Sequence, residues 1–224
     1  LPEASLPGLT TSLDESDTSS GIRCASTVDV TEQVLGYTGT VLAVLVFASP
    51  IETVVKVIRA ASIGDYDHLP YVSLLGMALL WIAYATVTPC HFLILLPNMI
   101  GAVMNASYLA IFLYYGSERR LRIGFTTCAM LAIVAVVVSA AVAYDMMGHP
   151  GGATSIMGFV TVLGGFLGFA SPLAVVGTVI STRSVKYMPL PLTLTIFLNC
   201  AVWTVFGVHT SDPFVLAANG TGFA

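Results

Sequence analysis

The sequence predicts an all-α membrane protein of seven transmembrane helices, in which a linker helix separates two three-helix units. Three observations point to this fold class. First, 56% of the 224 residues are hydrophobic and only 9% are charged, whereas a soluble domain carries about 25% charged residues. Second, the few charges separate apolar blocks that are each about one bilayer crossing long. Third, uncommon residues of the first half recur in the same order in the second half.

The apolar blocks define the predicted helices in order. The first six run over residues 33–51, 69–90, 92–117, 123–144, 153–182 and 187–208. The fifth begins at about residue 153 because Gly148-His149-Pro150-Gly151-Gly152 is a turn signal. After Asp212 only ~12 residues remain, fewer than a crossing needs, so we expect the seventh helix to be truncated. The stretch 130–138 is apolar throughout, which excludes the alternation of a membrane β-barrel strand.

The two halves of the chain repeat each other. The segment Phe47-Ala48-Ser49-Pro50 recurs as Phe169-Ala170-Ser171-Pro172, and Trp81 corresponds to Trp203. Because one extra helix lies between the two units, both units cross the membrane in the same direction, which makes a parallel repeat. We therefore expect a polar, acidic and disordered tail at 1–32, a first triple-helix repeat at 33–117, a linker helix at 118–147 and a second triple-helix repeat at 148–224.

The basic residues predict the orientation in the membrane. Seven of the 8 lie in or beside the connections after the first, third and fifth predicted helices, and Arg23 lies in the tail. The connections after the second, fourth and sixth helices contain none. The excess of basic residues on the cytosolic side then places the N-terminus outside or in a lumen. We expect an integral protein of the plasma membrane, with an endomembrane as the alternative. The chain has only 8 Lys and Arg and 12 Asp and Glu residues, which argues against a nucleic-acid partner.

The order of motifs resembles that of the SWEET-type sugar facilitators. The motifs are Ala170-Ser171-Pro172-Leu173, Lys186-Tyr187-Met188-Pro189, Phe197-Leu198-Asn199, Trp203, Asp212-Pro213-Phe214-Val215 and Asn219. The resemblance implies passive, bidirectional diffusion of a mono- or disaccharide by alternating access. It also implies a sugar substrate and a lipid bilayer as partners, a homo-oligomer, and neither a cofactor nor an enzymatic activity. Alternatives are an exporter of amino acids or another small neutral solute, and a seven-helix receptor, against which the internal repeat argues.

A sugar offers hydroxyl groups and two partly apolar ring faces, so an uncharged site needs amides and an aromatic platform. Asn98 and Asn219 occupy equivalent repeat positions. The resemblance carries the family's sugar-contacting positions onto these two residues and onto Trp203 and Trp81. The alternatives are interhelical hydrogen bonds for the asparagines, and packing or headgroup contacts for the tryptophans. Met77 stands where the family usually has Asn, which leaves the size of the substrate open.

Four prolines are candidate gate residues. Pro50 and Pro172 lie inside predicted helices, where the missing N–H weakens the helix. Pro70 and Pro189 begin two others, which is also a common structural use of proline. By resemblance, these four residues are the proline tetrad whose kinks open and close the cytosolic gate.

A second pair of residues matches the outer gate of the family. Tyr84, near the outer end of the second predicted helix, can hydrogen-bond Asp212 at the start of the seventh. The alternative for Asp212 is an ordinary loop acid.

Charge within the helices bears on ion coupling. Glu52, two residues after Pro50, is the best candidate for a proton site, but its spacing of four residues from Lys56 predicts a surface ion pair near the cytosolic end instead. We therefore expect transport that is not coupled to protons. The sequence also shows neither a catalytic cluster nor metal-ligand spacing, so we expect no metal.

Overall fold

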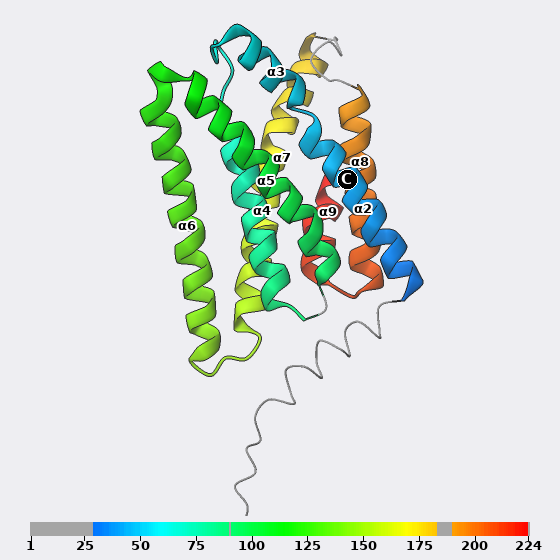
Figure 1. Ribbon diagram of the computed structural model, residues 1–224. Coiled ribbons are helices and arrows are strands. Elements are labelled where there is room, and N and C mark those ends of the chain that lie inside the picture. Colours follow the sequence, from blue (N-terminus) through cyan, green and yellow to red (C-terminus); the bar gives the residue numbers. More distant parts are fainter. Residues whose placement is uncertain (1–28, 90, 183–189, 224) are drawn as a thin grey trace, which may run out of the picture.

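The computed structural model describes residues 29–89, 91–182 and 190–223 (Figure 1). These residues form α-helices joined by short connections, and no strand occurs among them. The elements are α2 (Val30–Ala48), α3 (Ile51–Ala60), α4 (Leu69–Val87), α5 (Phe92–Tyr115), the short 3-10 helix η1 (Ser117–Arg119), α6 (Arg120–Met146), α7 (Gly152–Thr182), α8 (Leu190–His209) and α9 (Pro213–Phe223). The predicted all-α fold class is therefore confirmed.

Within the described residues, five helical segments are long and apolar enough to cross a membrane. They are Val30–Ala60, Leu69–Val87, Phe92–Tyr115, Ser117–Met146 and Leu192–His209. The predicted boundaries agree with them to within a few residues, with one clear exception. The first helix does not stop at its first charge but continues as α3 to Ala60. Lys and Arg are good helix formers, and their long side chains reach water from a helix end. A charged residue therefore does not mark the end of this helix.

Six helices, in the order α2, α5, α4, α7, α9 and α8, form a closed ring in which each packs against the next. The helix α6 lies at the outside of the bundle (Figure 1). In the first unit α5 lies between α2 and α4, and in the second unit α9 lies between α7 and α8. The units meet where α2 packs against α8 and where α4 packs against α7. The two units therefore have the same internal order, and the linker helix α6 contacts α4, α5 and α7. This arrangement is the predicted 3+1+3 architecture.

We call the end at which α2 begins the outer end, and the opposite end, at which α3 finishes, the inner end. The hydrophobic core at the outer end draws on both units and the linker, because Tyr84, Ala141, Met157, Phe206 and Val215 come from α4, α6, α7, α8 and α9. Apolar packing thus joins the two units at the outer end.

The first helix breaks at Pro50. α2 ends at Ala48 and α3 begins at Ile51, with Pro50 in the N-cap position. The hydroxyl of Tyr108 in α5 donates a hydrogen bond of 3.1 Å to the carbonyl of Phe47, three residues before Pro50. The ring of Phe47 lies against Gly101 of α5, where a Cβ atom would come within 2.5 Å of it. The break is therefore held against α5 by one polar and one apolar contact.

Replacing Tyr108 by Phe should destabilise the fold. The substitution removes the donor to a backbone carbonyl beside the break, and hydrogen bonds between membrane helices contribute about 1 kcal/mol. We expect a lower midpoint of thermal unfolding in detergent for Tyr108→Phe, whereas Tyr114→Phe, at a position that is 72% exposed, should unfold like the wild type. Equal midpoints for all three proteins would show that this hydrogen bond does not support the break.

Candidate functional site

A cavity of about 350 Å³ lies between the two units. Its walls come from six helices, namely α2, α4 and α5 of the first unit and α7, α8 and α9 of the second. None of the described residues that line it is charged, and its polar side chains are chiefly amides and indoles. The structure brings together here Trp81, Asn98, Trp203 and Asn219, the four positions that the resemblance implies for sugar contact. Met77, which stands where the family usually has Asn, lines the same cavity.

The two equivalent asparagines adopt the same geometry in both units. Asn98 donates from Nδ2 to the carbonyl of Ile94 at 2.8 Å, and Asn219 donates to the carbonyl of Val215 at 2.9 Å. Each bond runs to the residue four positions earlier, within the same helix. An amide carries two N–H donors and an acceptor oxygen, so this bond leaves capacity for further partners. These bonds fix the orientation of each side chain on its own helix, and they do not link two helices.

The two tryptophans differ in their surroundings. Trp203 is only 7% exposed and packs against Phe206, with ring centroids 5.2 Å apart. Its ring also lies over Gly39 of α2, where a Cβ atom would come within 2.7 Å. A residue so deeply buried is not a headgroup anchor. Trp81 is less buried and meets the ring of Tyr84 edge-on at 5.5 Å, so it connects the cavity to the outer end.

Met77 and Asn199 occupy equivalent positions in the two repeats, and both line the cavity. The sulfur of Met77 lies over Gly164 of α7, where a Cβ atom would come within 2.5 Å of it. The Oδ1 atom of Asn199 is buried, and the described residues offer it no hydrogen-bond partner. The cavity is therefore asymmetric, with a thioether on one side and an open amide acceptor on the other. Sequence reasoning left Asn199 out of the site, although its repeat relation to Met77 pointed to it.

Tyr84 and Asp212 meet above the cavity, as their sequence positions predict. The Tyr84 hydroxyl donates to Oδ2 of Asp212 at 2.8 Å. Asp212 is only 5% exposed, and its Oδ1 accepts the backbone N–H groups of Phe214 and Val215 at 2.9 and 3.0 Å, at the start of α9. The carboxylate thus caps a helix and bonds the opposite unit, which an ordinary loop acid does not do.

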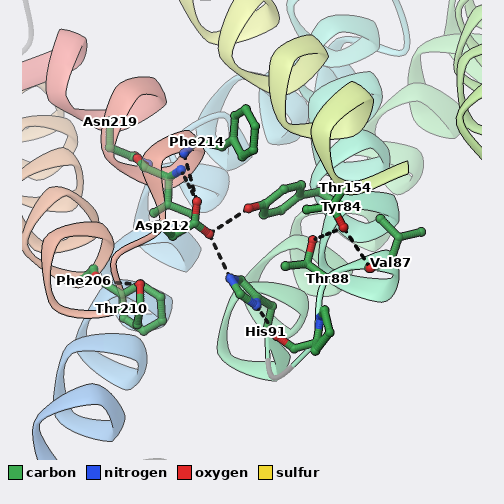
Figure 2. Close-up of polar contacts among 12 residues, drawn as sticks. Tyr84, Val87, Thr88, His91, Thr154, Phe206, Thr210, Asp212, Phe214 and Asn219 are labelled. Atoms are coloured by element: carbon green, nitrogen blue, oxygen red, sulfur yellow. Dashed lines mark hydrogen bonds and ion pairs between the residues drawn. The ribbon is translucent and has the colours of Figure 1, made fainter. Parts of the chain in front are cut away.

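His91 completes this group, and sequence reasoning missed it. Its Nε2 lies 2.8 Å from Oδ2 of Asp212, and its Nδ1 lies 2.6 Å from the carbonyl oxygen of Pro89. Figure 2 shows Tyr84, His91 and Asp212 pointing toward one another from two different units. We call these three residues the outer triad. In the sequence, His91 only marked the limit of an apolar block.

The surroundings of Asp212 and His91 favour the ionised forms of these two members of the outer triad. Burial alone raises the pKa of Asp212, but the hydrogen bonds from His91, from the Val215 backbone and from Tyr84 outweigh it, and the net pKa is lowered. Burial alone lowers the pKa of His91, but the bonds to Asp212 and to the Pro89 carbonyl outweigh it, and the net pKa is raised. Both pKa shifts therefore favour the charged forms, an imidazolium beside a carboxylate.

The four candidate gate prolines lie at different kinds of position in the chain. Pro50 lies at the break between α2 and α3, and Pro70 lies in the first turn of α4. Pro172 lies within α7, and Pro189 lies outside the described residues. The structure adds Pro97, a buried proline inside α5 that lines the cavity and that sequence reasoning did not single out.

The expected ion pair at the inner end is present. Lys56 Nζ lies 2.7 Å from Glu52 Oε1, and both side chains are more than half exposed. Glu52 is thus part of a surface pair away from the cavity. Within the described residues, no group of His, Cys, Asp and Glu side chains is arranged to hold a metal ion.

Comparison with known proteins places this geometry in a family. The model of a family described as "Sugar efflux transporter for intercellular exchange" matches residues 33–120 and 155–224, and the unmatched residues between them contain nearly all of α6. Two bidirectional sugar transporters of Arabidopsis thaliana are similar. SWEET16 is 34% identical over 84% of this chain and 82% of its own length, and SWEET17 is 35% identical over 84% and 78%.

A solved structure agrees with these relatives. A eukaryotic SWEET transporter matches with a TM-score of 0.81 and 30% identity, over 87% of this chain and 91% of its own. Fold, paired repeats and relatives lead to the same conclusion, and the chain belongs to the SWEET family of sugar transporters.

Proposed function

We propose that this protein carries a mono- or disaccharide across a membrane in either direction, by facilitated diffusion through alternating access. The observation that carries the proposal is the uncharged cavity of about 350 Å³ between the two repeats, with asparagines and tryptophans on its walls. Amides donate to and accept from sugar hydroxyls, and an indole packs against an apolar ring face. The names of the relatives support the same substrate class.

In this proposal the sugar binds between the two units. Asn98 and Asn219 hydrogen-bond its hydroxyls, Trp203 and Trp81 provide the platform, and Met77 limits the space on one side. Asn199 adds an acceptor through its unpartnered oxygen. Several weak, neutral contacts suit a carrier, because a site that binds too tightly does not release its cargo.

Access alternates between the two ends. Tyr84 and Asp212 close the outer end through their hydrogen bond. The break at Pro50, together with Pro70, Pro172 and Pro189, lets the inner parts of the helices swing and opens the inner end. The sugar thus leaves on the side opposite to the closed end.

Transport in this proposal is passive and involves no enzymatic step. The described cavity residues carry no charge, and Glu52, the best candidate for a proton site in the sequence, forms an exposed pair with Lys56. A proton-driven carrier needs an ionisable group along the path of its substrate. The direction of net flow then follows the sugar gradient.

The protein lies in the plasma membrane in this proposal, with its outer end and N-terminus facing outside and an endomembrane as the alternative. All described basic residues support this orientation. They lie at the inner end, and the cytoplasmic loops of membrane proteins carry an excess of Lys and Arg. They are Lys56, Arg59, Arg119, Arg120 and Arg122.

We further propose that copies of the chain associate into a homo-oligomer, which cross-linking in native membranes tests.

Uptake by cells that lack their own sugar carriers tests the proposal. We expect the wild type to take up labelled hexoses or sucrose, and Asn219→Ala to lower uptake at least about tenfold, because a lost hydrogen bond to a polar ligand costs on the order of 1–3 kcal/mol. Thr221→Ala, an exposed position on the same helix, should transport normally. Uptake of neither sugar by the wild type, with the protein present in the membrane, would exclude the proposal.

A further inference from the structure

Two histidine–carboxylate pairs join the two units at the outer end. His91 lies before α5 and pairs with Asp212, which lies before α9. His209 ends α8 and pairs with Asp29, the N-cap of α2, with Nε2 and Oδ2 3.0 Å apart. Each pair therefore connects one residue of the first unit to one of the second. They differ in burial, because the side chains of the first pair are 17% and 4% exposed and those of the second 34% and 55%.

We propose that His91 is a positioning residue of the outer gate, which holds Asp212 in place and makes closure of that gate depend on protons. Acidification of the outer solution stabilises the closed outer end and slows sugar exchange. This inference rests on the proposed transport function, since it assigns the regulation of the same pathway. His209 has no such role, because an exposed pair contributes little to stability.

The hydrogen-bond geometry of His91 carries the argument. Its Nδ1 faces the carbonyl oxygen of Pro89, which only accepts, so Nδ1 must bear a proton to form that bond. Its Nε2 faces Oδ2 of Asp212, and that carboxylate accepts the Tyr84 hydroxyl at the same oxygen. A neutral ring has one N–H group only and leaves one of these contacts between two acceptors. The imidazolium form, with two N–H groups, satisfies both.

The surroundings of His91 favour the same form. The titratable groups that face it are Tyr84 of α4, Asp212 of the α8–α9 connection and Glu32 in the first turn of α2. Two of these three are acids, and no Lys or Arg of the described part lies at this end. Tyr84 also meets the His91 ring edge-on, with centroids 5.8 Å apart, so the three members of the outer triad support one another.

Opening the outer end separates these partners and sets the sign of the pH effect. The pKa of His91 is raised in the closed state, and once the ring is released into water its pKa returns to an ordinary value of about 6.5. Closure is therefore most stable below that ordinary value, and this stabilisation is lost as the pH rises through the raised pKa. The lowered pKa of Asp212 has its effect only at more acidic pH, so His91 governs the neutral range.

Exchange of labelled sugar in proteoliposomes tests this inference. With the same pH and the same sugar concentration on both sides, neither a proton gradient nor a sugar gradient drives net flow. We expect wild-type exchange to slow at least about threefold between pH 8 and pH 5.5, because one unit of pKa difference changes the ratio of closed to open states about tenfold. In His91→Gln, which keeps one neutral donor, the exchange rate should not change with pH. His209→Gln, the matched exposed pair, should keep the wild-type profile.

Two outcomes would overturn the inference, and each differs from a failure of transport itself. They are a wild-type exchange rate that does not change with pH, and a wild-type pH dependence that persists in His91→Gln.

A second readout does not depend on transport. The chain contains 4 histidines, so NMR of labelled imidazoles in nanodiscs follows His91 directly, with single substitutions as assignments. We expect His91 to titrate above the ordinary value in the wild type and to return toward it in Asp212→Asn. Titration at or below that value in the wild type would also contradict the inference, whether or not the protein transports sugar.

Discussion

Replacing Trp203 by Ala is expected to lower sugar transport at least tenfold, the largest effect of any single substitution in the cavity. The ring is 7% exposed, packs on Phe206 and fills the space left by Gly39 of α2. The substitution removes the aromatic platform for the sugar, and it opens a gap between α2 and α8 that costs about 3–5 kcal/mol of folding stability. Radiolabelled uptake per molecule of protein at the cell surface measures the effect.

Loss of folding must be separated from loss of binding in this case. Trp203→Phe keeps an aromatic face and most of the packing, so it should retain part of the transport and raise the KM for sugar. Gly39→Ala keeps the indole but displaces it, since the added Cβ would come within 2.7 Å of the ring. We expect it to raise the KM as well. Wild-type KM values in both variants would show that Trp203 packs the helices without contacting the sugar.

Replacing Pro50 by Ala should also slow transport at least tenfold, but by a different route. Alanine supplies the N–H that proline lacks and allows α2 and α3 to form one continuous helix, which is favoured by up to about 3 kcal/mol over a proline-broken one. The hinge is then lost while the cavity stays intact. We expect an unchanged dissociation constant for sugar, measured by isothermal titration calorimetry, together with slow exchange in proteoliposomes.

Thermal stability provides the control for the Pro50 variant. A misfolded protein unfolds at lower temperature, whereas a straightened helix leaves the unfolding midpoint unchanged or raises it. Wild-type exchange rates in a protein of undiminished stability would show that the break at Pro50 is not needed for alternating access.

Much of the fold follows from local pattern. Blocks without charges are long enough to be read directly as helices, and a proline inside such a block marks the break before α3. The repeat relation also brings Asn98 together with Asn219, because equivalent positions of two packed units face the same space. These features depend on composition and periodicity, which a single sequence displays.

The remainder depends on contacts between distant residues. His91 and Asp212 are 121 positions apart, and nothing near His91 in the sequence indicates a carboxylate partner. The seating of Met77 on Gly164 likewise requires the packing of α4 against α7. Charge-delimited blocks also ended the first helix too early, since Lys56 and Arg59 belong to α3. Tertiary packing decides these points, and local pattern does not.

Countertransport in proteoliposomes tests the central claim, a neutral cavity that opens alternately to the two sides, most directly. Vesicles are loaded with unlabelled sugar and diluted into a trace of labelled sugar, with and without a protonophore. A passive alternating-access carrier predicts transient accumulation of labelled sugar above its outside concentration, unchanged by the protonophore. Absence of this overshoot, or its collapse when the proton gradient is dissipated, would contradict the claim.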